Sequence, residues 1–163
     1  MTVIGLASVD DADEIGVFQT RCWEQAYRGI VSDSYLDATT WQMRALRWRE
    51  RIDRGERQVW TARTGADLVG VASTVPTAHG RNDLPALELS SIYVDEAAHG
   101  SGLASELLDA AIGSRDTHLL VFTSNGRAQR FYAKHDFVPT DDVRTDPDTG
   151  VEEQRWVRIA ARP

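Results

Sequence analysis

The sequence predicts an α/β fold of the α+β kind, in which helices flank a mixed, mostly antiparallel sheet. Three features carry this prediction. Segments with strand and helix periodicity follow one another in the order β, α, α, β, β, β, α, β, α, β, β along the 163 residues. Turn residues join neighbouring strands into antiparallel hairpins towards both ends of the chain. A strand, a helix and a second strand form a crossover in the middle, which places one parallel strand pair at the centre of the sheet.

The N-terminal half is expected to contain a short strand, two helices and a hairpin. Ser8 is suited to cap the first helix, because acidic residues follow in the first turn, where the helix dipole favours them. Thr39 is suited to open a capping box at the second helix. The predicted strands are Val3–Leu6, Gln58–Arg63 and Leu68–Val75, and the predicted helices lie between Ser8 and Gly29 and between Thr39 and Gly55.

The second predicted helix carries arginines outside its apolar face. Glu50 and Asp53 interrupt this basic run, which favours a solvated helix face over a patch for nucleic acid. The whole chain has 18 Lys and Arg against 25 Asp and Glu, a formal net charge of −7, which argues against a nucleic-acid partner. The acidic balance is compatible with cationic substrates such as amines. The arginines of the helix are Arg44, Arg47, Arg49, Arg51 and Arg54.

The C-terminal half supplies the crossover and a closing hairpin. Leu119–Thr123 is short and apolar, as in strands that are buried within a parallel pair. Residues 146–150 form a turn sequence rich in Asp, Pro and Gly between the last two strands. The predicted strands are Ala86–Val94, Leu119–Thr123, Phe137–Thr145 and Val151–Ile159, and the predicted helices are Gly100–Ile112 and Asn125–His135.

Length and composition indicate one globular domain over residues 1–163. Hydrophobic residues make up 42% of the chain, which excludes a disordered protein. No apolar run approaches the roughly 20 residues that span a bilayer, so no membrane partner is expected. Cys22 is the single cysteine, which excludes an internal disulfide and a zinc site built from several cysteines. We expect Cys22 to be a buried small hydrophobe, the protein to be cytoplasmic, and no metal to be bound.

The most informative stretch is Gly100-Ser101-Gly102, which follows a β-rich run and precedes a helix. Glycines allow the backbone to approach a ligand closely, and the free N–H groups at a helix start attract anions. The loop is therefore suited to a phosphate or pyrophosphate, although a plain strand-to-helix turn would look the same. A dinucleotide-binding fingerprint is disfavoured, because Ser105 stands where a third glycine or alanine is required.

Two segments in the second half together resemble the GCN5-related N-acetyltransferase (GNAT) family. His99–Ala104 is similar to the family's Arg/Gln-x-x-Gly-x-Gly/Ala loop, and Asn125–Phe137 is similar to its Asn-x-x-Ala-x-x-Phe/Leu-Tyr-x-x-x-Gly-Phe helix. Trp23–Asp37 also resembles many members. His99, Glu96 and Asp136 depart from the usual residues of the pattern, although Asp tolerates the left-handed torsion that a glycine would adopt.

The resemblance implies that acetyl-coenzyme A (acetyl-CoA) is the cosubstrate. The glycine loop would hold its pyrophosphate, and the backbone of the preceding strand would pair with the pantetheine arm like an added strand. Asn125 would contact the coenzyme, and it is equally suited to cap its helix. The implied coenzyme-binding residues are Ile92, Tyr93, Val94, His99, Gly100, Ser101, Gly102, Leu103, Ala104, Ser105 and Asn125.

The implied reaction is direct transfer of the acetyl group to a primary amine within a ternary complex. Tyr132 occupies the family's tyrosine position, and a phenol with a pKa near 10 is a suitable proton donor to the departing thiolate. Glu88 is the candidate base or water-relay residue, with His79 and Glu24 as alternatives. The structural alternatives are that Tyr132 is a core tyrosine and that Glu88 is a strand carboxylate facing solvent.

The resemblance also places the acceptor beside Trp23 and Tyr27. They are four residues apart and so share one helix face, where they would serve as core or as an aromatic wall for a cationic substrate. The acceptor, a small-molecule or peptide amine, is not identified by the sequence. An acyl-CoA-binding sensor or interaction module with the same fold is the alternative function. Dimers are common in the family, so a homodimer is compatible with the sequence, although no interface is evident.

Overall fold

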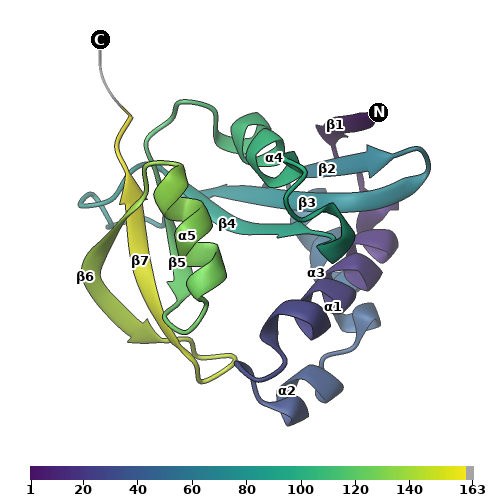
Figure 1. The fold of residues 1–163 in the computed structure, drawn as a ribbon, viewed down its shortest axis with the longest axis horizontal. Helices are drawn as coiled ribbons and strands as arrows, with labels where there is room; N and C mark the ends of the chain where they lie inside the picture. The colour runs from purple at the N-terminus through teal and green to yellow at the C-terminus, as the bar shows by residue number, and fades with distance from the viewer. Residues whose placement is uncertain (161–163) are drawn as a thin grey trace.

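The computed structural model describes residues 1–160, which contain one seven-stranded sheet (Figure 1). The strand order is β1-β2-β3-β4-β5-β7-β6, and all neighbouring strands are antiparallel except β4 and β5, which run parallel. The predicted fold class is therefore confirmed, and the last three residues of the predicted 1–163 domain lie outside the described part. The strands are β1 (Thr2–Leu6), β2 (Gln58–Thr64), β3 (Asp67–Pro76), β4 (Leu87–Val94), β5 (Thr117–Phe122), β6 (Val138–Thr145) and β7 (Glu152–Arg158).

Helices cover both faces of the sheet. On one face α4 and α5 pack over a core that includes Leu107, Leu119 and Phe137. On the other face α1 and α3 bury Ile15 and Trp48 against β2 and β3. Within residues 1–160, no helix has the length and apolarity that crossing a membrane requires. The helices are α1 (Ala12–Tyr27), α2 (Asp33–Ala38), α3 (Trp41–Asp53), α4 (Leu103–Ile112) and α5 (Gly126–Lys134), with 3₁₀ turns η1 (Val9–Asp11) and η2 (Glu96–Ala98).

Two predicted helix starts are corrected by the capping contacts. Ser8 does form a capping box with Asp11, but this box caps the short turn η1. Helix α1 begins after η1, at Ala12. Thr40, not Thr39, caps α3, because its Oγ1 accepts from the backbone N–H of Met43 at 3.3 Å. The Thr39 hydroxyl instead donates to the carbonyl of Tyr35 at 2.8 Å at the end of α2. The two threonines are thus divided between two helices.

Gly16 sets how closely α1 approaches α3. A Cβ atom added there would lie 2.7 Å from the backbone nitrogen of Ala45 and 2.7 Å from the backbone oxygen of Trp41. Only a hydrogen fits between the two backbones, so a glycine is required at this crossing. The close approach brings the residues around Ala45 against α1, and it thereby fixes where the side chains of α3 project.

Candidate active site

The parallel strands β4 and β5 are paired at only two positions. Leu87 lies opposite Thr117 and Glu88 lies opposite His118, after which the strands separate. Beyond these positions β5 continues its pairing with β7, while β4 stays paired with β3 on its other side. The edge of β4 that faces β5 therefore has no strand partner over Ile92–Val94 within the described residues.

A bulge in β4 accompanies this separation. Ser91 lies opposite Ser73 and Leu89 lies opposite Thr74, so Ser90 is an extra residue between two paired positions. A bulge bends its strand and redirects the neighbouring side chains. The bend falls two residues after the last β4–β5 pair, and it accounts for the divergence of the two strands.

His118 lies where the strands part, and it is buried, with 1% of its surface exposed. Arg155 donates to Nδ1 at 2.6 Å, so the proton of the neutral ring is on Nε2, which donates to the Thr77 hydroxyl at 2.8 Å. Burial, and then the charge of Arg155, lower the pKa of His118 to about 4. Nε2 is also 4.0 Å from a carboxylate oxygen of Glu88.

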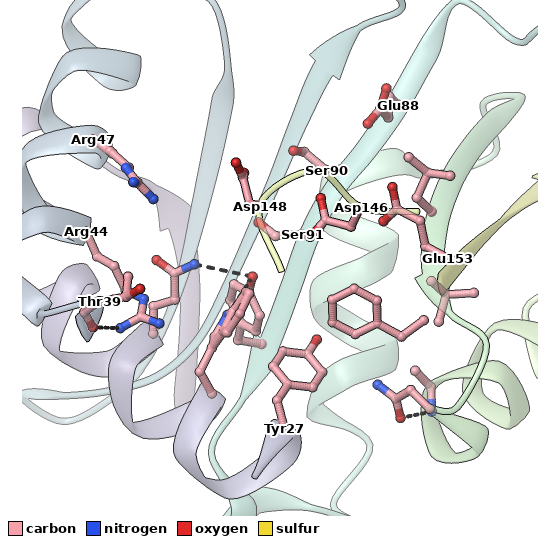
Figure 2. A pocket seen from close by; sticks show the side chains of 18 of the residues that line it. Tyr27, Thr39, Arg44, Arg47, Glu88, Ser90, Ser91, Asp146, Asp148 and Glu153 are labelled. Atoms are coloured by element: carbon pink, nitrogen blue, oxygen red, sulfur yellow. Dashed lines mark hydrogen bonds between the residues drawn. The ribbon is translucent and has the colours of Figure 1, made fainter. Parts of the chain in front are cut away.

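A cavity of about 400 Å³ opens between the separated strands (Figure 2). It is walled by β4 on one side, by β5 and α5 on another, and by α1, α3 and the β6–β7 turn around its mouth. The predicted site residues that line it are Trp23, Tyr27, Glu88, Tyr93, Asn125 and Tyr132. The other predicted coenzyme-binding residues do not line this cavity. They lie along β4, in the loop that follows it and in the first turn of α4, and they are Ile92, Val94 and 99–105.

The glycine loop has the geometry expected of an anion site. Gly100 and Gly102 have φ angles of 80° and 92°, and Gly102 is the N-cap of α4. The helix therefore begins at Leu103, three residues later than predicted. Among the described residues, the N–H groups of Gly100, Gly102 and Ala104 have no hydrogen-bond acceptor. A Cβ atom added at either glycine would meet nothing within 4 Å, so the space beside these two Cα atoms is open.

Three predicted side chains of this loop have different surroundings. The Ser101 hydroxyl donates to the carbonyl of Ala98 at 2.6 Å and so closes the turn. The Ser105 hydroxyl lies 3.0 Å from Nε2 of His135, which ties the start of α4 to the end of α5. His99 is exposed. The loop thus offers a ligand mainly its backbone N–H groups.

Tyr132 faces the cavity from α5. Its ring packs against Phe137, with centroids 5.7 Å apart, and against Phe131 at 5.5 Å. Burial, and then the neighbouring Tyr93 hydroxyl, raise the pKa of Tyr132 well above its ordinary value of 10. The phenol is therefore protonated at neutral pH and is placed as a donor rather than as a base.

Trp23 and Tyr27 meet on one face of α1, as their spacing predicted. Their ring centroids are 4.7 Å apart in an edge-to-face arrangement, and Tyr27 packs in the same way on Phe122 at 5.3 Å. The Trp23 indole N–H donates to the Tyr93 hydroxyl at 3.2 Å. These contacts make a rigid aromatic surface that is both part of the packing and part of the cavity wall.

Asn125 caps α5 and lines the cavity. Its side-chain oxygen accepts from the N–H of Ala128 at 3.2 Å, so the predicted capping role is confirmed. At the other end of α5, Asp136 has a φ of 66° and is the one residue other than glycine with a positive φ within the described chain. The expectation that Asp136 replaces a glycine in a left-handed conformation is also confirmed.

The sequence analysis missed a group of arginines that lines the cavity, which we call the arginine wall. Arg44 is 4% exposed, so the prediction of a solvated helix face is wrong for this residue. It is buried because α1 and the end of α2 enclose it, and it donates to the Thr20 hydroxyl at 3.0 Å and the Thr39 carbonyl at 2.7 Å. The available signal was an i, i+3, i+7 spacing on α3, which puts side chains on one helix face. The arginine wall consists of Arg44, Arg47, Arg51 and Arg57.

Carboxylates line the opposite part of the cavity, and we call them the acidic side. Figure 2 shows Arg44 and Arg47 at one end of the view and Asp146 and Glu153 at the other. The Glu153 carboxylate accepts from Arg144 at 2.8 Å, and burial raises its pKa above the ordinary range. The acidic side consists of Glu88, Asp146 and Glu153, and Asp148 lies between it and the arginine wall in the view of Figure 2.

Two further sequence-based expectations concern metals and Cys22. Cys22 lies on the buried face of α1, and desolvation is the main cause that raises its pKa to about 12. A thiol with so high a pKa is a poor nucleophile. In residues 1–160 there is no group of three or more His, Cys, Asp or Glu side chains that is arranged to hold a metal ion.

Comparison with known proteins decides the family. Residues 23–149 match the model of the acetyltransferase (GNAT) domain. The chain belongs to the GNAT acetyltransferase family. It is also 31% identical over 137 residues to uncharacterized N-acetyltransferases of Mycobacterium tuberculosis and Mycobacterium bovis, a match that covers 78% of this chain and 83% of each relative. As a GNAT acetyltransferase, the protein is an acyltransferase enzyme, and the resemblance of its motifs to that family is confirmed.

Solved structures share the GNAT fold over nearly the whole chain. The PaiA N-acetyltransferase of Thermoplasma acidophilum in complex with coenzyme A is 17% identical, with a TM-score of 0.72, and the match covers 95% of this chain and 98% of that one. YncA, a putative acetyltransferase of Salmonella typhimurium with acetyl-CoA, is 16% identical with a TM-score of 0.70, covering 100% and 98%. At these identities the likeness shows the fold.

Proposed function

We propose that this GNAT protein, acting as a single domain, transfers the acetyl group of acetyl-CoA to the primary amine of a small acceptor, directly within a ternary complex. The observation that carries the proposal is the divergence of β4 and β5 beside the glycine loop. It leaves an unpaired strand edge that leads from open N–H groups into a polar cavity. Two structural neighbours of the same fold are described with coenzyme A or acetyl-CoA.

The residues present fit the coenzyme. The free N–H groups at Gly100, Gly102 and Ala104 lie at the start of α4, where the helix dipole adds to their attraction for a pyrophosphate. The free edge of Ile92–Val94 has the donors and acceptors that pair with an extended amide-containing chain. Asn125 lines the cavity, which supports its proposed contact with the coenzyme. When bound, acetyl-CoA supplies the activated acetyl thioester.

Two protons must move in this reaction, and the cavity holds a candidate for each. We assign Glu88 to receive the proton of the ammonium group, directly or through water, because the carboxylate is half-buried at the point where the strands part. We assign Tyr132 to donate a proton to the thiolate, since its phenol is protonated and faces the cavity from α5. Trp23 and Tyr27 form the aromatic wall that orients the acceptor.

Calorimetry and a thiol-release assay test the proposal together. Coenzyme A should bind with a stoichiometry of one, and acetyl-CoA with an amine panel should release free thiol. Tyr132→Phe should lower kcat by roughly 10²–10⁴-fold with little change in coenzyme affinity, the usual contribution of a positioned acid. Glu88→Gln should shift the pH dependence of kcat/KM, and Glu152→Gln, an exposed carboxylate on β7, is the control that should not.

The outcomes separate the enzyme from the sensor. Turnover that is unchanged in Tyr132→Phe would remove that residue from the mechanism. Coenzyme binding without turnover on any amine would favour the acyl-CoA-binding sensor. Absence of coenzyme binding would contradict the proposed use of the glycine loop.

A further inference from the structure

We propose that the acceptor is an amino acid, a small zwitterion whose carboxylate binds the arginine wall while its amine faces the acidic side of the cavity. This inference rests on the proposed function, because it names the acceptor of the same site. It differs from a purely cationic acceptor, with which the acidic net charge of the chain is also compatible.

The first argument is that Arg44 is a buried cation without a counter-ion. Its two hydrogen-bond partners, the Thr20 hydroxyl and the Thr39 carbonyl, are neutral, and its guanidinium lies 5.2 Å from the Trp23 ring centroid. Among the described residues no carboxylate lies within ion-pair distance of it. A buried charge is ordinarily paired, because desolvation is costly. The missing partner is therefore expected to be a ligand.

The second argument is that the other members of the arginine wall are also unpaired. Arg51 stacks on Trp48 at 5.5 Å, and Arg57 donates to the Ser90 hydroxyl, but neither contacts a carboxylate within the described chain. Several arginines elsewhere do so, for example Arg63 with Glu14 at 2.5 Å, although Arg115 and Arg158 bond only to backbone carbonyls.

The neighbouring charges relieve this arrangement only in part. Desolvation is the main cause that lowers the pKa of Arg44, Arg51 and Arg57, and Arg47 lowers the pKa of Arg44 and Arg51 further. Asp148 acts in the opposite direction on Arg51, and Glu88 does so on Arg57, although neither carboxylate is within ion-pair distance. Mutual repulsion of the guanidinium groups is what an anion between them would relieve. Arginine is also the side chain best suited to a carboxylate, because its planar donors bind the two oxygens together.

The third argument is that carboxylates line the part of the cavity away from Arg44 and Arg47. The acidic side includes Glu88, which lies where the strands part and where the acetyl group would be presented. A polyamine would place a positive charge against the arginine wall, and a dicarboxylate without an amine would place a negative charge against Glu88. A molecule with one amine and one carboxylate complements both the arginine wall and the acidic side. The cavity, at about 400 Å³, is of the size that takes a small molecule.

The experiment compares matched acceptors. Each of the twenty standard amino acids, its carboxamide and the amine that lacks the carboxyl group would be assayed with acetyl-CoA by thiol release. At least one amino acid should exceed its own carboxamide in kcat/KM by tenfold to a hundredfold, the range expected for charge-assisted hydrogen bonds. The carboxamide retains the size and the amine, so the comparison isolates the carboxylate charge.

Variants connect the preference to the arginine wall. Arg44→Gln should remove most of the preference for the amino acid over its carboxamide, with a rise in KM for the amino acid alone. Arg47→Gln provides the same test at an exposed position where folding is not at risk. Arg54→Gln removes an exposed arginine just after α3 that does not line the cavity, and its preference should match that of the unaltered protein.

The results separate this inference from the proposed function. If carboxamides or plain amines are acetylated as well as the amino acids, the inference is overturned while the acetyltransferase stands. If coenzyme A binds but no amine is acetylated, the proposed function fails. The inference is then decided by titrating each amino acid against the fluorescence of Trp23 and Trp48, which line the cavity. Saturable quenching with a dissociation constant that rises at least tenfold in Arg47→Gln would support the carboxylate site. Absence of quenching by every amino acid would overturn it.

Discussion

Lowering the pH from 7 to 4 should destabilise this protein through a single buried imidazole, His118. In the folded state Nδ1 accepts from Arg155 at 2.6 Å and Nε2 donates to Thr77 at 2.8 Å. A second proton has to enter at Nδ1, where it would break the bond from Arg155 and set two cations against each other. The unfolded chain has no such constraint, so it takes up the proton more readily.

The size of the effect follows from the two pKa values. The pKa of His118 falls from an ordinary value of 6.5 to about 4 in the folded protein. Between these two pKa values the unfolded state binds more protons than the folded state. The contribution of neutral His118 to the free energy of unfolding is therefore fully present above pH 6.5 and is lost as the pH falls towards 4. A difference of about 2.5 units corresponds to about 3 kcal/mol of unfolding free energy.

Urea unfolding followed by tryptophan fluorescence at pH 7, 6, 5 and 4.5 would measure this loss. His118→Asn keeps an acceptor for Arg155 but does not titrate, so its free energy of unfolding should fall less steeply over the same window. Desolvation also lowers the pKa of His135, but that residue is present in both proteins and cancels in the comparison. Equal losses in the two proteins would refute the assignment of the acid sensitivity to His118.

Three smaller predictions concern the scaffold. Gly16→Ala should lower the free energy of unfolding by about 1–3 kcal/mol in urea titrations, because the new Cβ would meet the backbone nitrogen of Ala45 at 2.7 Å. Gly5→Ala is the control, since its Cβ would meet nothing within 4 Å, and its free energy of unfolding should change by no more than about 0.5 kcal/mol. Cys22, with a pKa of about 12, should resist iodoacetamide at pH 8 in the folded protein and react once urea unfolds it; rapid labelling of the folded protein would contradict its burial. Asp136→Ala should lower the free energy of unfolding by about 1 kcal/mol at its φ of 66°, while Asp136→Asn should be nearly neutral, and equal effects would argue against a torsional cause.

Features encoded by neighbouring residues could be predicted from the sequence. The hairpin of β2 and β3 was placed to within one residue at each end, because alternating side chains and the Thr64–Asp67 turn define both strands locally. The start of α4 was placed three residues early, because the torsions of Gly100 and Gly102, not their presence, decide where the helix begins. The choice between Thr39 and Thr40 as a cap was missed for a related reason, since the preceding helix α2 engages the first of them.

The candidate site depended on contacts between distant parts of the chain. His118 has no helical or alternating pattern that signals burial, and its partners Thr77 and Arg155 are 41 and 37 residues away. The motif residues of the coenzyme site could be found because each lies within a short segment that resembles the family. The acceptor site has no such segment, because its walls come from α1, α3, Arg57, β4 and the β6–β7 turn.

The arginine wall shows why the net charge of the chain could not identify the acceptor. A net charge of −7 governs encounter and solubility over the whole surface, whereas recognition depends on the few charges that are desolvated beside the ligand. In this protein the overall balance is acidic, yet Arg44 is buried with only neutral partners. A buried charge is in itself weak support for stability, because the cost of its desolvation opposes the gain from its contacts. Arg44 lies in the part of the cavity away from Glu88, and a role in binding the acceptor accounts for it better than a role in stability. The comparison of an amino acid with its carboxamide measures that role directly.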